Sequence, residues 1–246
     1  MPNGKVLVTL SGPSCVGKGP LQKAVERFYP GLLSCRPVLY HSRHPRPGEF
    51  HGRDYYFLPA SEVRSLAAAA APDMVLARVR GDWQALDMGH VADLLDGNDL
   101  VFAEVYHTFL GELTAAAKHA GVEVRSIFLL PAELPASDSH IITTMRDKLD
   151  RRGLDSEEKA KERSESAPEE VGSGFRATHR LINIAGEDDT DEWGEFGIRD
   201  GKKGEREIRT PPDLGERARW LVERFVEIVQ QSKLGGTYRY PDKDPT

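Results

Sequence analysis

The chain has 246 residues, two cysteines and a formal net charge of −6 at pH 7, and this length suffices for one α/β domain with inserted segments. The negative charge excludes a general nucleic-acid binder, whose affinity depends on a dense basic face, and no apolar run is long enough to predict a membrane partner. The cysteines match neither a metal-ligand spacing nor a disulfide framework, so we expect a cytoplasmic protein with reduced thiols.

The first predicted strand, at 6–10, leads through a glycine-bearing loop into a helix with apolar residues from Leu21 onward. A strand, such a loop and a helix in this order are typical of a phosphate-binding loop. Gly12 and Gly17 let the backbone N–H groups curl toward phosphate oxygens, and Lys18 can reach the terminal phosphates. The predicted cofactor-binding residues are Gly12, Pro13, Ser14, Cys15, Val16, Gly17, Lys18, Gly19 and Pro20.

The position after the lysine departs from the usual pattern. It usually carries Ser or Thr to hold Mg²⁺, whereas here Gly19 and Pro20 offer no hydroxyl. An ordinary glycine-rich turn is the alternative interpretation of the loop. The amide-rich surroundings could lower the pKa of Cys15, but we expect it to serve only as a small side chain.

A proline-stiffened basic stretch follows a predicted strand at 35–40. Arg43 and Arg46 flank Pro45, so two guanidinium groups are presented with little entropy to lose, and Tyr55 could complete a site for a phosphate monoester. The alternative is a solvated basic turn. The irregular spacing of the nearby histidines favours surface histidines over metal ligands.

Three motifs together resemble the guanylate kinase family: Gly-Pro-Ser-Cys-Val-Gly-Lys-Gly at 12–19, Ser-Arg-His-Pro-Arg-Pro-Gly-Glu at 42–49 and Gly-Arg-Asp-Tyr at 52–55. Their order and spacing are more specific than any one of them. The resemblance covers roughly residues 4–186. It implies that the acceptor phosphate is bound by Arg43, Arg46 and Tyr55, with Glu49 as the associated carboxylate.

Residues 74–86 resemble the segment with which that family reads guanine, but they diverge at the reading positions. The family's glutamate falls on Val75, its tyrosine on Gln84 and its serine on Leu86. Apolar side chains cannot pair with a guanine edge, and each unpaired buried polar group would cost about 1–3 kcal/mol. Core packing of a strand is the alternative for this stretch, and Gln84 stays a candidate substrate-binding residue.

A predicted strand at 99–105 carries one carboxylate, Glu104. An acid at the end of a strand beside a phosphate loop can orient Mg²⁺ through water. The resemblance therefore implies Glu104 as the metal-organising residue, although pairing with a base is the alternative. The family's second acid falls on Tyr106, whose ring could stack on a different base or sugar.

Helices are predicted at 61–71, at 90–95 and at 109–119, and a buried strand at 122–130. Residues 137–171 are polar and helical, and Asp155 with Glu158 has the spacing of a capping pair. The resemblance implies that Arg152 and Arg163 belong to a lid and close on the transferring phosphate. A solvated pair of charged helices is the alternative.

The last predicted sheet strand is 181–184, and Ala185-Gly186 replaces the asparagine that follows this strand in the family. In the charged, glycine-punctuated insertion at 187–207, Asp188, Asp189, Asp191 and Glu192 could bind a cation, but such an acidic run favours a solvated loop. Trp193, Phe196 and Ile198 suggest that part of this insertion folds back onto the body. An amphipathic helix at 211–231 and a tail at 233–246 complete the chain.

Strands alternating with helices predict a parallel α/β domain. The resemblance implies a P-loop nucleotide kinase fold, a parallel five-stranded sheet flanked by helices with an acceptor-binding insertion and a lid. The predicted segments are a guanylate-kinase-like domain at 1–186, with core pieces at 1–35 and 96–136, the acceptor-binding insertion at 36–95, the lid at 137–171 and the last strand at 179–184, then a charged insertion at 187–210, a core helix at 211–232 and the tail.

The function implied is an ATP-dependent phosphotransferase that uses Mg²⁺ and acts on a small phosphorylated acceptor. Lys18, Arg152 and Arg163 would be catalytic, and the acceptor would be a nucleoside monophosphate, either GMP or one with an altered base. A kinase of a non-nucleotide sugar phosphate is one alternative. Another is a catalytically inactive binding module, favoured by Gly19 and Pro20.

Overall fold

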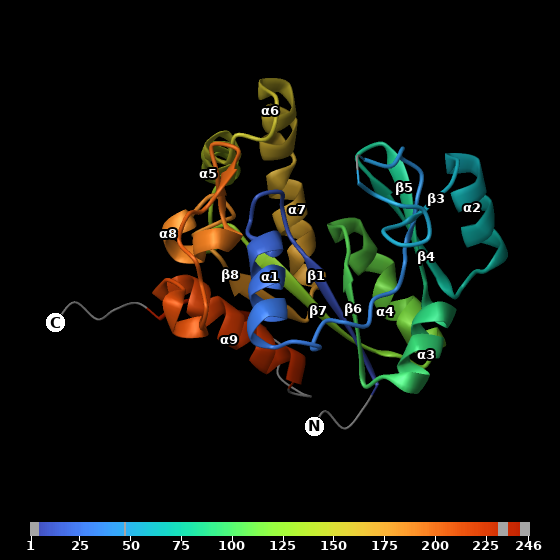
Figure 1. Cartoon of the computed structure of the whole chain (residues 1–246). Coiled ribbons are helices and arrows are strands. Elements are labelled where there is room, and N and C mark those ends of the chain that lie inside the picture. The colour runs from blue at the N-terminus through green and yellow to red at the C-terminus, as the bar shows by residue number, and fades with distance from the viewer. Residues whose placement is uncertain (1–4, 47, 231–235, 242–246) are drawn as a thin grey trace. The chain divides into compact units, whose positions relative to one another are not determined.

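The computed structural model describes residues 5–46, 48–230 and 236–241, and the chain divides into two compact units (Figure 1). Unit 1 comprises Met1–Thr9 and Leu33–Ser126, and unit 2 comprises Leu10–Leu32 and Ile127–Thr246. The predicted acceptor-binding insertion falls in unit 1, and the predicted lid falls in unit 2 with the phosphate loop. In the described ranges, no helix combines the length and the apolar character needed to cross a bilayer.

The main sheet is parallel and has five strands in the order β11-β8-β7-β1-β6. Every residue of β1 is buried, as are the last six of β7, which is typical of parallel strands covered on both faces. The predicted parallel five-stranded sheet is therefore confirmed. Its strands are β1 (Val6–Ser11), β6 (Leu100–Glu104), β7 (Glu123–Leu130), β8 (His179–Ile182) and β11 (Gly236–Tyr238).

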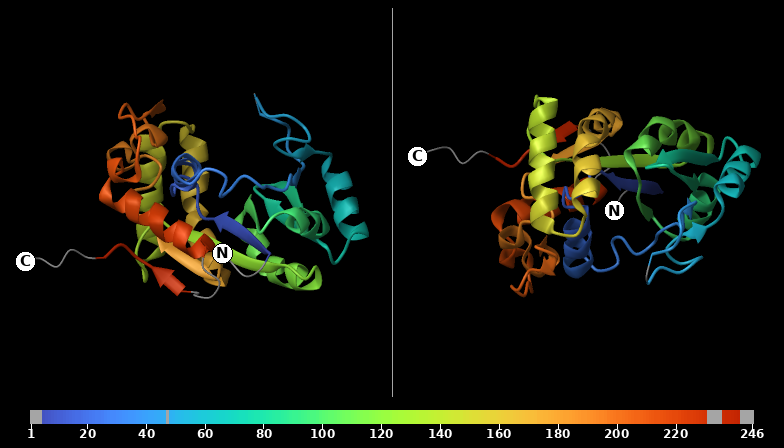
Figure 2. Two further views of the ribbon diagram at one scale, coloured as in Figure 1. Left: turned by 60° about the horizontal axis from the view of Figure 1, so that its bottom comes forward. Right: turned by 90° about the horizontal axis from the view of Figure 1, so that it is seen from above.

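The strand predicted at 35–40 does not form over that range, and the main sheet gains a strand from the predicted tail. Residues 35–39 form no strand, and Pro37 has no N–H to donate there, although the Cys35 carbonyl accepts from the Phe102 amide at 2.9 Å. Instead β11, from the predicted tail, pairs in parallel with β8 (Figure 2), and the register places Thr237 opposite Arg180. The rest of that tail, 233–235 and 242–246, lies outside the described residues.

Unit 1 carries a second sheet of four strands in the order β3-β2-β5-β4. Arg80 and Gly81, with φ of 50° and 90°, turn the chain between β4 and β5, which pair as an antiparallel hairpin. The helices cover an apolar cluster that includes Leu7, Leu86 and Phe109. The elements of this unit are β2 (Tyr40–His41), β3 (Tyr56–Phe57), α2 (Ala60–Ala69), β4 (Met74–Val79), β5 (Asp82–Asp87), α3 (Met88–Gly97), the short 3-10 helix η1 (His107–Phe109) and α4 (Leu110–His119).

In unit 2 the helix that follows the phosphate loop, α1, packs against the amphipathic C-terminal helix α9. The charged insertion folds back as predicted, because Trp193 is fully buried and Phe196 is 8 % exposed. The elements of this unit are α1 (Lys18–Phe28), α5 (Asp138–Arg152), α6 (Glu157–Glu165), α7 (Ala167–Ser173), η2 (Gly174–Arg176), α8 (Thr190–Trp193), η3 (Gly194–Phe196), β9 (Ile198–Arg199), β10 (Lys202–Lys203), η4 (Pro211–Asp213) and α9 (Glu216–Gln230).

Candidate functional site

The loop between β1 and α1 has the backbone of a phosphate cradle. Gly12 has φ 144°, and a Cβ there would lie 2.8 Å from the Leu129 carbonyl oxygen. Gly17 has φ 98° at the N-cap of α1, and a Cβ there would collide with the carboxamide nitrogen of Asn183. Both positions therefore require glycine. Helix α1 begins directly at Lys18, so its unpaired N–H groups and partial positive charge lie at the loop.

The Lys18 ammonium lies back over its own loop. Its Nζ donates to the carbonyl oxygens of Gly12 at 2.7 Å and Pro13 at 2.8 Å. These carbonyl acceptors are neutral, and a phosphate oxygen would add the attraction between opposite charges to the hydrogen bond. The lysine is thus held at the loop by bonds that an anion can replace.

Cys15 is a small buried side chain rather than a reactive thiol. Its Sγ donates to the Lys148 carbonyl at 3.3 Å, and burial raises the pKa of the thiol to about 12. The lowered pKa considered from the sequence is therefore wrong. Burial outweighs the opposing attraction of the Arg152 guanidinium.

Asn183 supports the phosphate loop from the end of β8. Its carboxamide donates to the Val16 carbonyl at 2.7 Å, and the residue is 3 % exposed. Because β8 ends at Ile182 and not at Ile184, Asn183 is the residue that follows the strand. The expectation that Ala185-Gly186 replaces the asparagine after this strand is therefore wrong, because the predicted strand ended at 184 and β8 ends at Ile182.

The two predicted lid arginines share one carboxylate. Asp155, 7 % exposed, forms ion pairs with Arg152 and with Arg163, the latter at 3.0 Å. Asp155 does not cap α6 as its spacing with Glu158 predicts; the N-cap is Ser156. Arg152 Nη1 also reaches Glu187 Oε2 at 3.1 Å. The structure thus brings Arg152 and Arg163 together through Asp155, for which the sequence predicted a helix-capping role.

The acidic run of the insertion is not simply a solvated loop. Asp188 is 3 % exposed and accepts from Arg151 Nε at 2.6 Å. Lys148 lies beside it with its Nζ on the Ile184 carbonyl, and burial lowers the pKa of this lysine. Part of the run therefore belongs to a buried ionic group behind the phosphate loop, with basic partners that lie more than thirty residues earlier in the chain.

In unit 1, Arg43 and Glu49 form a bidentate ion pair. Arg43 Nη1 and Nη2 donate to the two Glu49 oxygens at 2.6 and 2.7 Å, and the Arg46 N–H donates to Oε2 at 2.7 Å. Chiefly because of the Arg43 hydrogen bonds, the pKa of Glu49 falls to about 2. The Arg43 guanidinium also lies 5.3 Å from the ring centres of Tyr55 and Phe57. The structure thus brings Arg43, Glu49 and Tyr55 together, and the exposed Arg46 side chain belongs to the same loop.

His41 supports this loop, and the sequence reasoning placed it on the surface. It is 4 % exposed, and its Nδ1 accepts from the Arg43 N–H at 3.2 Å. Burial, followed by the nearby Arg43, lowers the pKa of His41 to about 4. The neutral imidazole can accept this bond and the protonated one cannot. Neutral His41 therefore holds the Arg43 N–H at the start of residues 42–49, the arginine loop.

We expect His41→Asn to flatten the pH dependence of stability between about pH 6.5 and pH 4. The folded protein protonates His41 only near pH 4, whereas the unfolded chain does so near 6.5. Between these values the unfolded state binds more protons, so stability falls as the pH drops. Urea unfolding of wild type, His41→Asn and the exposed control His44→Asn across this range measures the slope. Equal slopes in all three proteins would contradict the assignment.

The remaining predicted residues of unit 1 occupy different surroundings. Glu104 is the exposed last residue of β6, and its charge adds to burial in raising the pKa of Tyr55. Gln84, 8 % exposed, lies opposite His41 in the β2–β5 ladder. Tyr106 packs its ring 4.2 Å from the ring of His107. Glu104 thus acts on Tyr55 through its charge, and Gln84 is the cross-strand partner of His41.

Val75 and Leu86 are core residues, with exposed fractions of 1 % and 0 %. They face each other in the β4–β5 ladder and belong to the apolar cluster of unit 1. Their side chains therefore pack in the interior, and this agrees with the expectation that the two positions cannot read a guanine edge.

Within the described ranges, no group of three or more His, Cys, Asp or Glu side chains is arranged to hold a metal ion. Mg²⁺ does not require such a group, because it is usually bound by one or two carboxylates together with substrate phosphates and water. The glycine-lined loop and Lys18 fit a polyphosphate, and the carboxylates of Glu187 and Glu104 are ligands of the type that Mg²⁺ takes.

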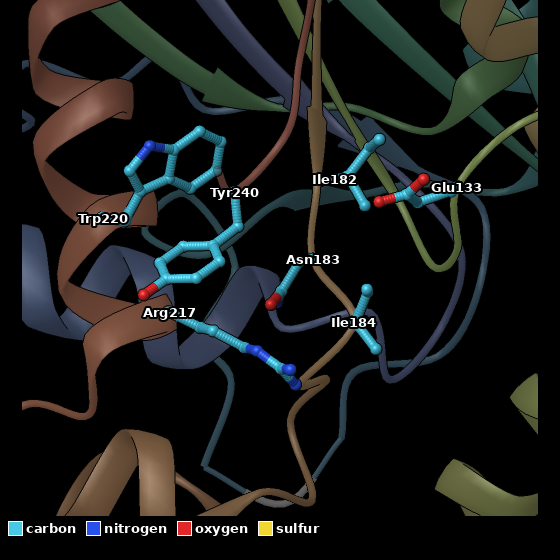
Figure 3. A pocket seen from close by; sticks show the side chains of 7 residues that line it. All are labelled: Glu133, Ile182, Asn183, Ile184, Arg217, Trp220 and Tyr240. Carbon is cyan, nitrogen blue, oxygen red and sulfur yellow. The ribbon is translucent and has the colours of Figure 1, made fainter. Parts of the chain in front are cut away.

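A small pocket adjoins the supporting residue Asn183 (Figure 3). The rings of Trp220 and Tyr240 meet edge to face in its wall, with centroids 6.0 Å apart. None of the predicted site residues lines this pocket, so it is a separate feature of unit 2. Its lining is Glu133, Ile182, Asn183, Ile184, Arg217, Trp220 and Tyr240.

The chain is similar to several known proteins. A family model described as guanylate kinase matches residues 4–179. A guanylate kinase of Ruegeria pomeroyi is 30 % identical over 225 residues, which are 91 % of this chain and 97 % of that protein. A guanylate kinase of Trichormus variabilis is 29 % identical and covers 74 % of this chain and 84 % of its own length. A crystal structure of guanylate kinase from Anaplasma phagocytophilum aligns with a TM-score of 0.49 at 20 % identity, over 73 % of this chain and 77 % of that one.

Proposed function

Because the chain belongs to the guanylate kinase family, we propose that it transfers the γ-phosphoryl group of ATP to the phosphate of a nucleoside monophosphate. The observation that carries this proposal is the placement of Lys18, whose ammonium is held over the glycine-lined loop by two exchangeable carbonyl bonds. A purely structural lysine would not need a loop in which two positions admit no side chain.

The donor triphosphate would be bound in unit 2. The N–H groups of the loop and of the α1 N-terminus would hold its phosphates, and Lys18 would exchange the Gly12 and Pro13 carbonyls for phosphate oxygens. Arg152 supports this role, because its buried Nε has no hydrogen-bond partner among the described residues. A phosphate oxygen would supply that partner. When bound, Mg²⁺ would neutralise charge on the phosphates.

The acceptor phosphate would be bound in unit 1. Arg43 is oriented by Glu49 and stacked near Tyr55, while Arg46 extends from the same loop. Planar guanidinium groups match the geometry of phosphate oxygens, and the Tyr55 hydroxyl adds a neutral donor. Glu49 stays ionised down to about pH 2, so it orients Arg43 throughout the physiological range.

The protein would accelerate the reaction by positioning and by charge. An acceptor phosphate oxygen is already a nucleophile, so no general base is required. Arg152 and Arg163 would place positive charge where the transferring group develops negative charge, and these terms supply most of the rate in phosphoryl transfer.

The base of the acceptor would be read by other residues than Val75 and Leu86. We propose Gln84 and Tyr106 for this task, since one carries a carboxamide beside the arginine loop and the other an aromatic ring after β6. GMP is the first acceptor to test, because the curated relatives carry the name guanylate kinase.

An ATP-consumption screen with Mg²⁺ across all ribo- and deoxyribonucleoside monophosphates tests the proposal. We expect turnover with one class of base and little with the others. GMP-selective turnover would mean that Gln84, Tyr106 or their neighbours read guanine, and another selective base would mean a rebuilt pocket. Failure to turn over any monophosphate would contradict the proposed function.

A further inference from the structure

The phosphate loop lacks the hydroxyl that normally contacts the metal. In such loops the Ser or Thr after the lysine binds Mg²⁺, and here Gly19 and Pro20 stand at the two positions after Lys18. A proposal that the chain uses Mg²⁺ therefore needs an oxygen from elsewhere in unit 2.

Glu187 brings a carboxylate to that place. A Cβ added at Gly19 would lie 3.4 Å from Glu187 Oε1, an ordinary van der Waals contact. A side chain after Lys18 would thus touch the Glu187 carboxylate. Apart from the two adjoining residues and the backbone of helix α1, no other heavy atom of the described residues lies within 4 Å of that Cβ. A carboxylate oxygen of a residue 168 positions further along the chain thus lies beside position 19.

The backbone holds Glu187 in this position. Its N–H donates to the Cys15 carbonyl of the loop at 3.0 Å. The preceding residue, Gly186, has φ 72°, and a Cβ there would lie 2.6 Å from Asp188 Oδ1 and 2.8 Å from Lys148 Nζ. A side chain at this turn would be strained and would displace the Asp188 and Lys148 side chains, so glycine is favoured between Asn183 and Glu187.

The side chain has one oxygen engaged and one facing position 19. Glu187 Oε2 pairs with Arg152 Nη1 at 3.1 Å, and the side chain is 18 % exposed. A bare carboxylate beside a bound triphosphate would repel it, whereas a divalent cation between them turns the contact into an attraction. The Glu187 carboxylate should therefore favour ATP binding when the metal is present and oppose it when the metal is absent.

We propose that Glu187 is the metal-binding residue of the phosphate loop, in place of the absent hydroxyl. This inference rests on the proposed function, since it requires that the loop binds ATP with Mg²⁺. It also gives the start of the charged insertion a role at the donor site.

Calorimetric titration of ATP, with and without Mg²⁺, tests the proposal on wild type, Glu187→Gln and the exposed control Glu205→Gln. We expect Mg²⁺ to tighten ATP binding in wild type and in the control. In Glu187→Gln this enhancement should fall about tenfold, while metal-free ATP binds at least as tightly as before. Electron paramagnetic resonance of Mn²⁺ with ATP should show the same loss of bound metal.

A second variant separates metal binding from a structural role. Gly19→Ser in the Glu187→Gln background restores a hydroxyl after Lys18, and it should recover part of the Mg²⁺ enhancement. An unchanged enhancement in Glu187→Gln, or an equal loss of affinity with and without Mg²⁺, would overturn the inference and leave the proposed function intact. Absence of any ATP binding by wild type would overturn both.

Discussion

Lys18→Ala should lower turnover by about 10²- to 10³-fold while the protein stays folded. Lys18 is the only side chain of the loop itself that brings a positive charge to the bound phosphates, and the removal of one preorganised charge-stabilising donor costs about this much in other enzymes. Its two present bonds are to carbonyl oxygens of Gly12 and Pro13. Water can replace the ammonium there, so the free energy of unfolding should change by no more than about 1 kcal/mol.

Steady-state kinetics with the best acceptor, together with urea unfolding, measures both effects. Lys23→Ala is the matched control, because Lys23 lies on the same helix and is exposed. Turnover by Lys18→Ala within a few-fold of that by Lys23→Ala would show that the ammonium does not act on the phosphates.

Arg152→Ala should lose both stability and activity. Glu187, with a side chain 18 % exposed, would lose the guanidinium that now pairs with it, and Asp155 would keep only Arg163. Because Arg163 still compensates Asp155 and Glu187 is partly exposed, we expect a cost of about 1–3 kcal/mol, less than the about 3–5 kcal/mol of a buried charge left with no partner. Loss of an arginine from a phosphoryl-transfer site lowers kcat by about 10³-fold or more.

Two further variants separate these effects. Arg146→Ala, on the same helix, removes an exposed ion pair with Asp150 and should cost less than about 1 kcal/mol. Arg152→Lys keeps the charge but cannot span both acids, so we expect it to recover more stability than turnover. The same stability and turnover in the Arg152→Ala and Arg146→Ala variants would refute the assigned role.

The sequence was most informative where the signal is local. The phosphate loop lies within about ten residues, and glycine, lysine and the flanking apolar runs each have a physical meaning without knowledge of the fold. The arginine loop is equally local, since Glu49 lies six residues after Arg43 and can reach back to both of its nitrogens.

The sequence was misleading where two local signals compete. Asp155 and Ser156 are both good N-cap residues, and the spacing to Glu158 favoured Asp155. The structure uses Ser156 as the cap, which leaves Asp155 for Arg152 and Arg163. Only the turn between α5 and α6 decides which of the two side chains faces the helix amides.

Other features depend on partners that are distant in the chain. Asp188 belongs to an acidic run that composition assigns to solvent, and its burial requires Arg151 and Lys148 from another helix. Glu187 has no local signal at all, because its relation to Gly19 exists only after the insertion folds onto the loop. His41 was hidden for the same reason, since neighbouring strands bury it.

The strand β11 forms one edge of the main sheet and covers one side of β8. It occupies the outer position beside β8, whose own Leu181 and Ile182 are buried. Without it, the N–H and C=O groups along that side of β8 would be open to pairing with a strand from another molecule, and such open edges are where aggregation begins. A truncation after α9 would therefore be expected to lower solubility, because it would expose the edge of β8 in place of the short edge of β11.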